Sequence, residues 1–375
     1  MRILYLTEWS PFQESGVLKK LIAQVQAWRE LGADAQLLSI CTLSGATPAC
    51  SYEQFGKIVG TFHQDHLKRF PFARLGYWNK IVSAHQAAAV LQAAAPDLVY
   101  YRQHGPYYPG LGGLLERKPT IIEINTRAEV ESKLWGRAVD FMETRTREFV
   151  HRHAAGFVCM TDEIAVPFRR RGVPVAVIPN AINALQSEPL PPTKNRNPKL
   201  VIVATPLATS ACWNGVDKLF ALARRLSAFE FHVVGYSAAH FAEQAPANLV
   251  FHGYLDSEGL SAVYAQSDVG LGTLAAHRKK LEQACSLKTR EYLSYGLPVI
   301  VGYQEAEAGL RGKPYILEIP NRESNLLDSV DEIQRFAEQW LKRRVTDDLS
   351  FMSRQAKERE RLAFFEQILQ DSKAA

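Results

Sequence analysis

Residues 286–301, SLKTREYLSYGLPVIV, are the most informative part of the chain for predicting its fold. Residues 287–295 are typical of a short helix, which Gly296 ends before the apolar run 297–301 enters a strand. Ser286 suits the N-cap position, so the first amides of the helix and the charge of Lys288 would face a ligand. Glu291 lies one turn later on the same face, where its carboxylate can accept hydrogen bonds from two neighbouring hydroxyl groups. Hydrogen-bond donors for a phosphate, beside a carboxylate that accepts from two neighbouring hydroxyl groups, are typical of a site for a nucleoside diphosphate. A surface ion pair between the lysine and the glutamate is the alternative that the spacing leaves open.

The same alternation of strand and helix extends in both directions along the chain. In the first half we predict strands at 3–6, 35–40, 98–101, 120–124, 156–160 and 175–178, with helices at 17–31, 78–94 and 136–153. In the second half we predict strands at 200–204, 231–234, 249–251, 269–271 and 299–301, with helices at 216–226, 256–266 and 287–295. Repeated strand–helix–strand units predict an α/β fold with doubly wound parallel sheets.

A proline-rich segment separates the two halves. Residues 183–198, NALQSEPLPPTKNRNP, contain four prolines and no aromatic residue, which is typical of a linker. We therefore predict a Rossmann-like domain at 1–182, a linker at 183–198 and a second Rossmann-like domain at 199–345. Residues 346–375 form a separate C-terminal segment, and residues 333–369 are expected to be helical. Two such domains would bind a ligand in a cleft at the carboxyl ends of their strands.

Composition narrows the class of protein. The 47% apolar and 22% charged residues exclude disordered and fibrous proteins. A net charge of +5 is too small for a nucleic-acid-binding arm, but it is compatible with an anionic ligand or an acidic membrane surface. The five cysteines are odd in number and form no CxxC, which indicates reduced thiols. With no apolar span and no signal peptide visible, we expect a cytoplasmic protein with at most a peripheral contact at the inner face of the membrane. We expect no metal site, because His63 and His66 have no further ligands near them in sequence.

Several stretches together resemble the retaining GT-B glycosyltransferases of family 4, the nucleotide-sugar-dependent group 1 type. The resemblance covers nearly the whole chain and is strongest in Pro179-Asn180-Ala181-Ile182-Asn183, Val234-Gly235, Val250-Phe251-His252-Gly253-Tyr254, Ser267-Asp268-Val269, Ser286-Leu287-Lys288, Glu291-Tyr292-Leu293 and Gly296-Leu297-Pro298-Val299. It implies a GT-B fold of two Rossmann-like domains, with a C-terminal helix that crosses back to the first domain. It also implies transfer of a hexose from a nucleotide-diphosphate sugar to a hydroxyl acceptor (a saccharide, a lipid-linked or a small molecule) without a cofactor or metal. Such transfer serves the synthesis of polysaccharides, glycolipids or glycoconjugates.

The resemblance also implies roles for single residues. Glu291 would bind the ribose hydroxyls, and Lys288 with the amides of Ser286 and Leu287 would hold the diphosphate. Further donor-binding candidates are Gly16, Gly235, Tyr254 and Lys218. The first acid of the family's EX7E motif falls on Gln283, with Glu282 beside it, and Asn125 stands near the position of a sugar-contacting histidine in several relatives. The candidate catalytic residues are therefore Lys288, Glu282, Gln283 and Asn125.

The family's diphosphate-binding arginine and lysine are replaced in this chain. Their positions hold Ala204-Thr205-Pro206 and Trp213-Asn214-Gly215. Because catalysis depends on stabilising the charge of the leaving diphosphate, other cations must supply it. We predict that Arg278 or Lys279, in the run His277-Arg278-Lys279-Lys280, takes this catalytic role; an ordinary solvated loop is the alternative.

Polar residues also follow the predicted strands of the first half. Gly16 closes the loop 7–16 and would let a ligand approach the backbone. Arg102, His104, Glu123, Arg127 and Glu129 lie at or beyond strand ends and are predicted to face the acceptor, with a structural hydrogen-bond network as the alternative. A GT-B-type sugar-nucleotide epimerase and a binding subunit with a decayed nucleotide site remain alternative functions. The sequence leaves open the donor base, the sugar, the acceptor and the oligomeric state.

Overall fold

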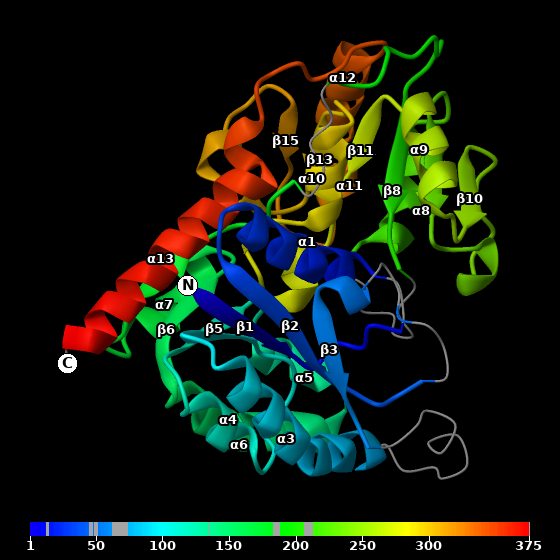
Figure 1. The fold of residues 1–375 in the computed structure, drawn as a ribbon. Helices are drawn as coiled ribbons and strands as arrows, with labels where there is room; N and C mark the ends of the chain where they lie inside the picture. The colour runs from blue at the N-terminus through cyan, green and yellow to red at the C-terminus, as the bar shows by residue number, and fades with distance from the viewer. Residues whose placement is uncertain are drawn as a thin grey trace. The chain divides into compact units, whose positions relative to one another are not determined.

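The computed structural model describes residues 1–12, 15–44, 48, 52–61, 74–134, 136–182, 188–205 and 213–374. The chain forms two compact units, coloured along the sequence in Figure 1. The first unit comprises Met1–Ile178 and Arg354–Ala375, and the second comprises Pro179–Ser353. The boundaries therefore fall at 178/179 and 353/354, where the sequence suggested 182 and 345.

A parallel sheet forms the centre of the first unit. In the described part of the chain its strands follow the spatial order β3 (Gly56–Val59), β2 (Asp34–Ile40), β1 (Arg2–Thr7), β4 (Leu98–Arg102), β5 (Thr120–Ile124), β6 (Ala154–Cys159) and β7 (Val175–Val177). The connecting helices are η1 (Tyr52–Gln54), α1 (Gly16–Glu30), α3 (Arg74–Ala94), α4 (Leu111–Leu115), α5 (Ala128–Leu134), α6 (Arg137–His151) and α7 (Asp162–Arg169). Strand β1 pairs with β2 and β4, so that Ile3 lies opposite Ala35 on one side and Leu98 on the other. The inner strands are buried apolar runs, as a sheet covered on both faces requires.

The C-terminal helix α13 (Arg354–Ala374) belongs to the first unit and lies along α1 (Figure 1). The indole Nε1 of Trp28 donates a hydrogen bond of 2.6 Å to the carboxylate of Glu358. The rings of Trp28 and Tyr100 pack against Phe365, with centroids 5.5 and 5.0 Å apart. These buried contacts confirm the predicted return of the chain to its first domain.

The continuous helix expected over residues 333–369 is wrong. Helix α12 (Val330–Trp340) and α13 are separated by residues 341–353, which hold only the short helix η6 (Ser350–Met352). Lys342 has a φ of +60°, and its amide donates to Asp268 Oδ1 at 3.2 Å. The guanidinium of Arg344 donates to the carbonyl of Ser267 at 2.7 Å. These bonds hold the segment against the second unit, and helical periodicity along the sequence does not reveal them.

The second unit contains another parallel sheet. Its order is β10 (Leu249–Gly253), β9 (Glu230–Val234), β8 (Lys199–Val203), β11 (Val269–Leu271), β13 (Val299–Val301) and β15 (Ile316–Glu318), and β12 (Gln283–Ala284) pairs separately with β14 (Gln304–Glu305). Its helices are η2 (Val216–Lys218), α8 (Leu219–Arg225), η3 (Ala238–His240), α9 (Ser257–Gln266), η4 (Ala276–Lys279), α10 (Leu287–Ser294), η5 (Ala308–Leu310), α11 (Asn325–Asp328) and α12. The chain runs outward in one direction from β8 and in the other from β11. The carboxyl edge between these two strands is where doubly wound sheets bind their ligands.

The described part of the predicted linker, residues 188–198, is bound to the second unit. Its anchor is Asp268, which is fully buried. The carboxylate of Asp268 accepts hydrogen bonds from the hydroxyl of Thr193, from Asn195 Nδ2 at 2.8 Å and from the amide of Lys199 at 3.0 Å. Residues 183–187 lie outside the described residues. The described part of the predicted linker therefore packs on the second unit through a carboxylate distant in sequence.

None of the helices in the described ranges is both long and apolar enough to cross a membrane.

Candidate active site

The carboxyl edge between β8 and β11 gathers several of the predicted donor-binding residues. The loop after β11 hydrogen-bonds to the loop after β8: the amide of Leu274 donates to Asn214 O at 3.2 Å and that of Ala275 to Trp213 O at 3.0 Å. Lys288, in the first turn of α10, extends to the same place, and its Nζ donates to Asn214 Oδ1 at 2.5 Å. The predicted diphosphate cation therefore lies at the point where the strand order reverses.

The first turn of α10 has the form of an anion site. Ser286 is the N-cap residue, but its side chain makes no capping hydrogen bond. The first amides of α10 lie at the positive end of the helix dipole. With the ammonium of Lys288 in the same turn, the arrangement can bind a phosphate.

Glu291 lies one turn beyond Lys288 and is half-buried. Burial raises the pKa of Tyr264 on α9 well above its usual range, and the neighbouring Tyr292 and the carboxylate of Glu291 raise it further. Glu291 thus lies beside α9, on the helix whose first turn forms the anion site. The structure brings Ser286, Leu287, Lys288 and Glu291 together as the sequence predicted.

Gly235 and Tyr254 follow β9 and β10. Gly235 has a φ of +95°, and a Cβ there would lie 2.0 Å from the carbonyl oxygen of Ala204. A glycine is therefore required for the close approach of the chain to the end of β8. Tyr254 is 79% exposed, so its ring is available to a ligand at the edge of the sheet.

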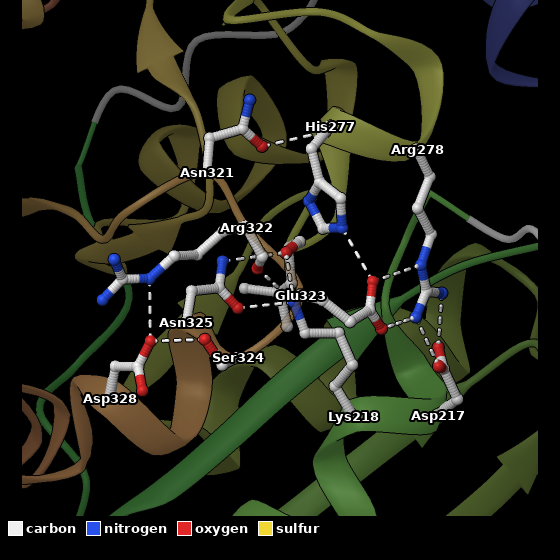
Figure 2. Close-up of polar contacts among 11 residues, drawn as sticks. Asp217, Lys218, His277, Arg278, Asn321, Arg322, Glu323, Ser324, Asn325 and Asp328 are labelled. Carbon is white, nitrogen blue, oxygen red and sulfur yellow. Dashed lines mark hydrogen bonds and ion pairs between the residues drawn. The ribbon is translucent and has the colours of Figure 1, made fainter.

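His277 and Arg278, in the basic run 277–280, belong to an ion-pair cluster that Figure 2 shows. The guanidinium of Arg278 binds Asp217 with two hydrogen bonds, of 2.9 and 2.7 Å, and also binds Glu323. His277 Nε2 bonds to the same Glu323 carboxylate at 2.7 Å. The hydrogen bonds that Arg278 donates to the carboxylates of Asp217 and Glu323 hold its pKa above its usual value. Two carboxylates therefore offset the charge of Arg278, which the sequence analysis predicted to stabilise a diphosphate.

Lys279 lies apart from that cluster. Its Nζ is 3.5 Å from the centroid of the Trp213 ring, a cation–π contact. Trp213 directly precedes Asn214, the residue that holds Lys288. Of the two cations predicted in this run, Lys279 is the one whose partner belongs to the candidate anion site.

Lys218 is not a diphosphate-binding residue, and this prediction is corrected. Its ammonium donates to the carbonyls of Leu274 and Arg322, both at 3.1 Å, and to Asn325 Oδ1 (Figure 2). These bonds use all three of its protons. Burial lowers the pKa of Lys218 to about 8, so the side chain is protonated at neutral pH. Lys218 fixes the loop after β11 to the segment before α11.

Glu282 and Gln283 lie beside a cavity of about 560 Å³ within the second unit. Its lining includes Glu282, Tyr303, Gln304, Glu318, Asn321 and Glu332. Glu282 accepts a hydrogen bond of 3.2 Å from Asn321, and Gln283 Nε2 donates to Gln304 at 2.9 Å. Carboxylates and amides of this kind suit hydroxyl groups better than phosphates.

In the first unit, Glu123 and Arg102 form a buried network. The carboxylate of Glu123 has no exposed surface; it accepts from Lys20 at 2.9 Å, Arg102 at 3.1 Å and Tyr5 at 2.8 Å. Burial alone would raise the pKa of Glu123, but Lys20 and Arg102 hold it far below its usual value. The acceptor-side role of these two residues is corrected to the structural network that the sequence left open.

Asn125 ends the same network with an unused donor. Its Oδ1 accepts from Lys20 at 3.0 Å, while its Nδ2 is buried and has no hydrogen-bond acceptor among the described residues. A buried amide donor without an acceptor costs free energy unless a ligand or water satisfies it. This observation keeps Asn125 as a candidate for contact with substrate.

The loop after β1 and the end of β4 form a second polar cluster. Glu8 is buried and binds Lys80 and the hydroxyl of Tyr101, the latter at 2.8 Å. The ring of His104 packs edge-on against Trp9, with centroids 5.3 Å apart. Burial, with Lys80 and Arg102 nearby, lowers the pKa of His104 to about 4, so the imidazole is neutral at pH 7.

The remaining predicted residues of the first unit lie at helix starts. Gly16 is the exposed first residue of α1, and Ser15 caps that helix through the amide of Leu18 at 3.1 Å. Arg127 binds Glu129 at 2.7 Å at the start of α5, and both side chains are partly exposed. They remain candidates for an acceptor contact.

Sequence reasoning missed the roles of Asn214, Lys20 and Glu8. Asn214 was noted only as a departure from the family pattern, although its place after β8 was a usable signal. Lys20 reads as an ordinary helix lysine, and nothing local indicates its buried partners. Glu8 lay in the loop identified as functional, where a carboxylate directly after a buried strand was the available signal.

Within the described ranges, no group of three His, Cys, Asp or Glu residues could hold a metal ion. His63 and His66 lie outside those ranges.

Residues 21–186 match the family model described as Glycosyltransferase Family 4. A comparison with curated protein sequences gives no match. Among solved structures, a lipopolysaccharide outer core galactosyltransferase WaaB in its apo form is 14% identical with a TM-score of 0.66, over 98% of this chain and 100% of that one. Sucrose-phosphate synthase (tll1590) from Thermosynechococcus elongatus is 13% identical with a TM-score of 0.63, over 100% of this chain and 98% of that one. UDP-GlcNAc 2-epimerase from Neisseria meningitidis bound to UDP-GlcNAc is 11% identical with a TM-score of 0.56, over 98% of this chain and 100% of that one.

The chain has the GT-B fold of these solved structures, and residues 21–186 are similar to Glycosyltransferase Family 4. The two parallel α/β units and the returning C-terminal helix confirm the predicted fold class. Most of the residues that match this family model belong to the first unit.

Proposed function

We propose that this protein transfers a hexose from a nucleotide-diphosphate sugar to a hydroxyl acceptor with retention of configuration. The observation that carries the proposal is the first turn of α10, where Lys288 Nζ is held 2.5 Å from Asn214 Oδ1 beside an uncapped helix start. Glu291 lies one turn further along the same helix. A phosphate site one helical turn from a carboxylate fits a nucleoside diphosphate, whose ribose carries two neighbouring hydroxyls.

In the proposed mechanism the diphosphate leaves towards the start of α10. The amides of Leu287 and Lys288 and the ammonium of Lys288 stabilise the charge that develops on it. Lys279, stacked on Trp213, is the second cation. The acceptor hydroxyl attacks the anomeric carbon on the face from which the diphosphate departs. Its proton passes to an oxygen of the departing diphosphate, so no protein side chain becomes a covalent nucleophile.

A thermal-shift screen tests the nucleotide site directly. We expect one of UDP, GDP, ADP, TDP and CMP to raise the melting temperature, because a ligand at about 100 times its Kd stabilises the folded state by about 2.7 kcal/mol. Glu291→Ala should weaken that nucleotide by about 1.5–3 kcal/mol, the value of hydrogen bonds to a charged group. Glu338→Ala, an exposed carboxylate on α12, is the matched control. A full shift in folded Glu291→Ala, or no shift with any nucleotide, would contradict the proposal.

We also propose that transfer needs no metal ion, because the cations of the chain itself offset the diphosphate charge. Release of nucleoside diphosphate from the donor should continue in excess EDTA. Loss of release in EDTA that magnesium or manganese restores would contradict this part of the proposal.

A further inference from the structure

The helix α10, which carries the candidate donor-binding residues, is short. It comprises eight residues, Leu287–Ser294, and isolated helices of this length are unstable in water. Tertiary contacts must therefore hold α10 in place. The hydroxyl of Tyr292 accepts a hydrogen bond of 2.8 Å from the amide of Val203. The hydroxyls of Thr289 and Tyr303 are hydrogen-bonded to each other at 3.0 Å.

Arg290 of the same helix is a buried arginine with well-defined partners. Only 1% of its surface is exposed. Its two terminal nitrogens donate to the two carboxylate oxygens of Glu305, at 3.0 and 2.6 Å, and its Nε donates to the backbone carbonyl of Asn180 at 3.0 Å. Glu305 has no exposed surface, and its carboxylate also accepts from the amide of Glu307 at 3.0 Å. The guanidinium is therefore held by bonds to two separate segments of the second unit.

Arg290 holds α10 on a different side from the candidate ligand-binding residues. It lies two positions after Lys288 and one before Glu291, and residues at these spacings do not face each other on a helix. Its partner Glu305 belongs to β14, and its partner Asn180 lies at the start of the second unit. A rotation or shift of α10 would break the bonds to both partners. The same movement would displace Lys288 and Glu291, which belong to the same rigid helix.

Stability alone does not account for this buried charge. Burial would lower the pKa of Arg290, but the carboxylate of Glu305 holds it above its usual value, so the guanidinium stays charged. Taking two charges out of water is costly, and well-packed apolar residues of similar size often stabilise a protein as much as a buried ion pair. A planar guanidinium that binds a carboxylate through two parallel bonds does, however, fix both distance and direction. An apolar contact would not supply this directional constraint.

We propose that Arg290 is a positioning residue for the nucleoside diphosphate. Its bonds to Glu305 and Asn180 fix the direction of α10. The ammonium of Lys288 and the carboxylate of Glu291 are thereby held at the places of the diphosphate and the ribose. Arg290 itself is buried and acts only through these two residues. The inference rests on the proposed function, because it concerns the same nucleotide site.

Nucleotide binding by a conservative variant tests the proposal. Arg290→Lys keeps the positive charge but loses the two parallel bonds, because an ammonium lacks the planar fork of a guanidinium. We expect it to raise the Kd of the tightest binder among UDP, GDP, ADP and TDP about ten-fold, as for one lost hydrogen bond to a charged group. In the Lys288→Ala background the same change should raise the Kd less than about two-fold, because the effect passes through the ammonium. Isothermal titration calorimetry of the folded variants measures these constants, which a role in folding alone would leave unchanged.

A second comparison separates positioning from stability. Arg290→Met should lower the melting temperature, because it leaves the buried charge of Glu305 uncompensated. Arg290→Met/Glu305→Leu removes both charges and should regain most of that loss, while the Kd stays raised because the bond to Asn180 is still missing. Arg311→Ala is the matched control. Arg311 donates to the carbonyls of Glu305 and Ala306, at 2.8 and 3.3 Å, and its removal should leave the Kd as in the wild type.

Hydrogen–deuterium exchange without nucleotide provides a measurement that does not depend on the proposed function. The amides of α10 should exchange faster in Arg290→Lys than in Arg311→Ala. If none of the four nucleotides binds the wild type, the proposed function is contradicted, and this comparison still decides whether Arg290 holds α10. The inference is overturned if Arg290→Lys keeps the Kd and the exchange of the wild type, or if its effect on the Kd is undiminished in the Lys288→Ala background. Recovery of the wild-type Kd in Arg290→Met/Glu305→Leu would also overturn it.

Discussion

Lys288 Nζ and Asn214 Oδ1 are 2.5 Å apart, which ties the start of α10 to the loop after β8. At the position of Asn214 the family-like pattern would have placed a cation. An asparagine cannot neutralise a phosphate, but it accepts a hydrogen bond from Lys288 and fixes the ammonium in place. The positioning of Lys288 therefore depends on a neutral residue.

Removing Lys288 should lower activity more than removing Asn214. Lys288→Ala should reduce kcat by about 10²–10³, the usual effect of losing one donor to developing negative charge. Asn214→Ala should reduce kcat less, by about ten-fold, because it only loosens the ammonium. In the double variant the two losses should not add, since both act through one group. The measurement is release of nucleoside diphosphate from the donor, with Lys313→Ala, an exposed lysine, as the control. Fully additive losses would show that Asn214 acts independently of Lys288.

Neighbouring cations Arg278 and Lys279 should behave differently when removed. Lys279→Ala should lower kcat more than it raises the donor KM, because a contact that grows with leaving-group charge acts mainly in the transition state. Arg278→Ala should instead lower the melting temperature, because it releases Asp217 and Glu323 from their shared partner. Donor kinetics and thermal unfolding of both variants check this division. If Lys279→Ala keeps the kcat and KM of the wild type while Arg278→Ala loses kcat, then Arg278, and not Lys279, is the cation that acts on the diphosphate.

The contact of α13 with the first unit should be essential for stability. Phe365 has no exposed surface and packs on Trp28 and Tyr100. Phe365→Ala should reduce the free energy of unfolding by about 3–5 kcal/mol, as expected for a large buried ring. The adjacent Glu366→Ala, on the exposed face of the same helix, should change it by less than about 0.5 kcal/mol. Urea denaturation compares the two, and equal effects would mean that α13 does not pack as described.

Acidification should destabilise the first unit before its carboxylates titrate. Burial, with Arg171 and Arg147 nearby, lowers the pKa of His151 to about 3, whereas an unfolded histidine titrates near 6.5. The unfolded state therefore binds more protons, and the free energy of unfolding falls as the pH drops through 6.5 towards 3. We expect a total loss on the order of 3–5 kcal/mol from this residue.

Urea denaturation between pH 7 and about pH 5 measures how the free energy of unfolding changes with pH before Glu123 contributes. A carboxylate whose pKa is lowered by folding loses its contribution to stability only below the pKa that it has in the unfolded chain. His151→Gln should flatten the dependence on pH, while the exposed His85→Gln should leave it as in the wild type. An unchanged slope in His151→Gln would contradict the prediction.

The local features of the candidate donor site could be predicted from the sequence. Gly296, the apolar run after it and Ser286 before the helix place α10 between two strands, because these signals act within a few residues. Lys288 and Glu291 fall on one helix face by spacing alone. The parallel order of both sheets followed from the alternation of strands and helices, which leaves few alternative topologies.

The partners of charged side chains depended on tertiary structure. Lys218 looked like a spare cation, yet its acceptor Asn325 lies 107 residues further along the chain. Glu123 looked like an exposed strand-end carboxylate, and its partner Lys20 comes from α1, 103 residues earlier. The sequence determines which backbone elements form, because hydrophobic periodicity and capping are local. Only the folded chain decides whether a charge is available to a ligand, because burial and distant partners determine its hydrogen bonds and its pKa.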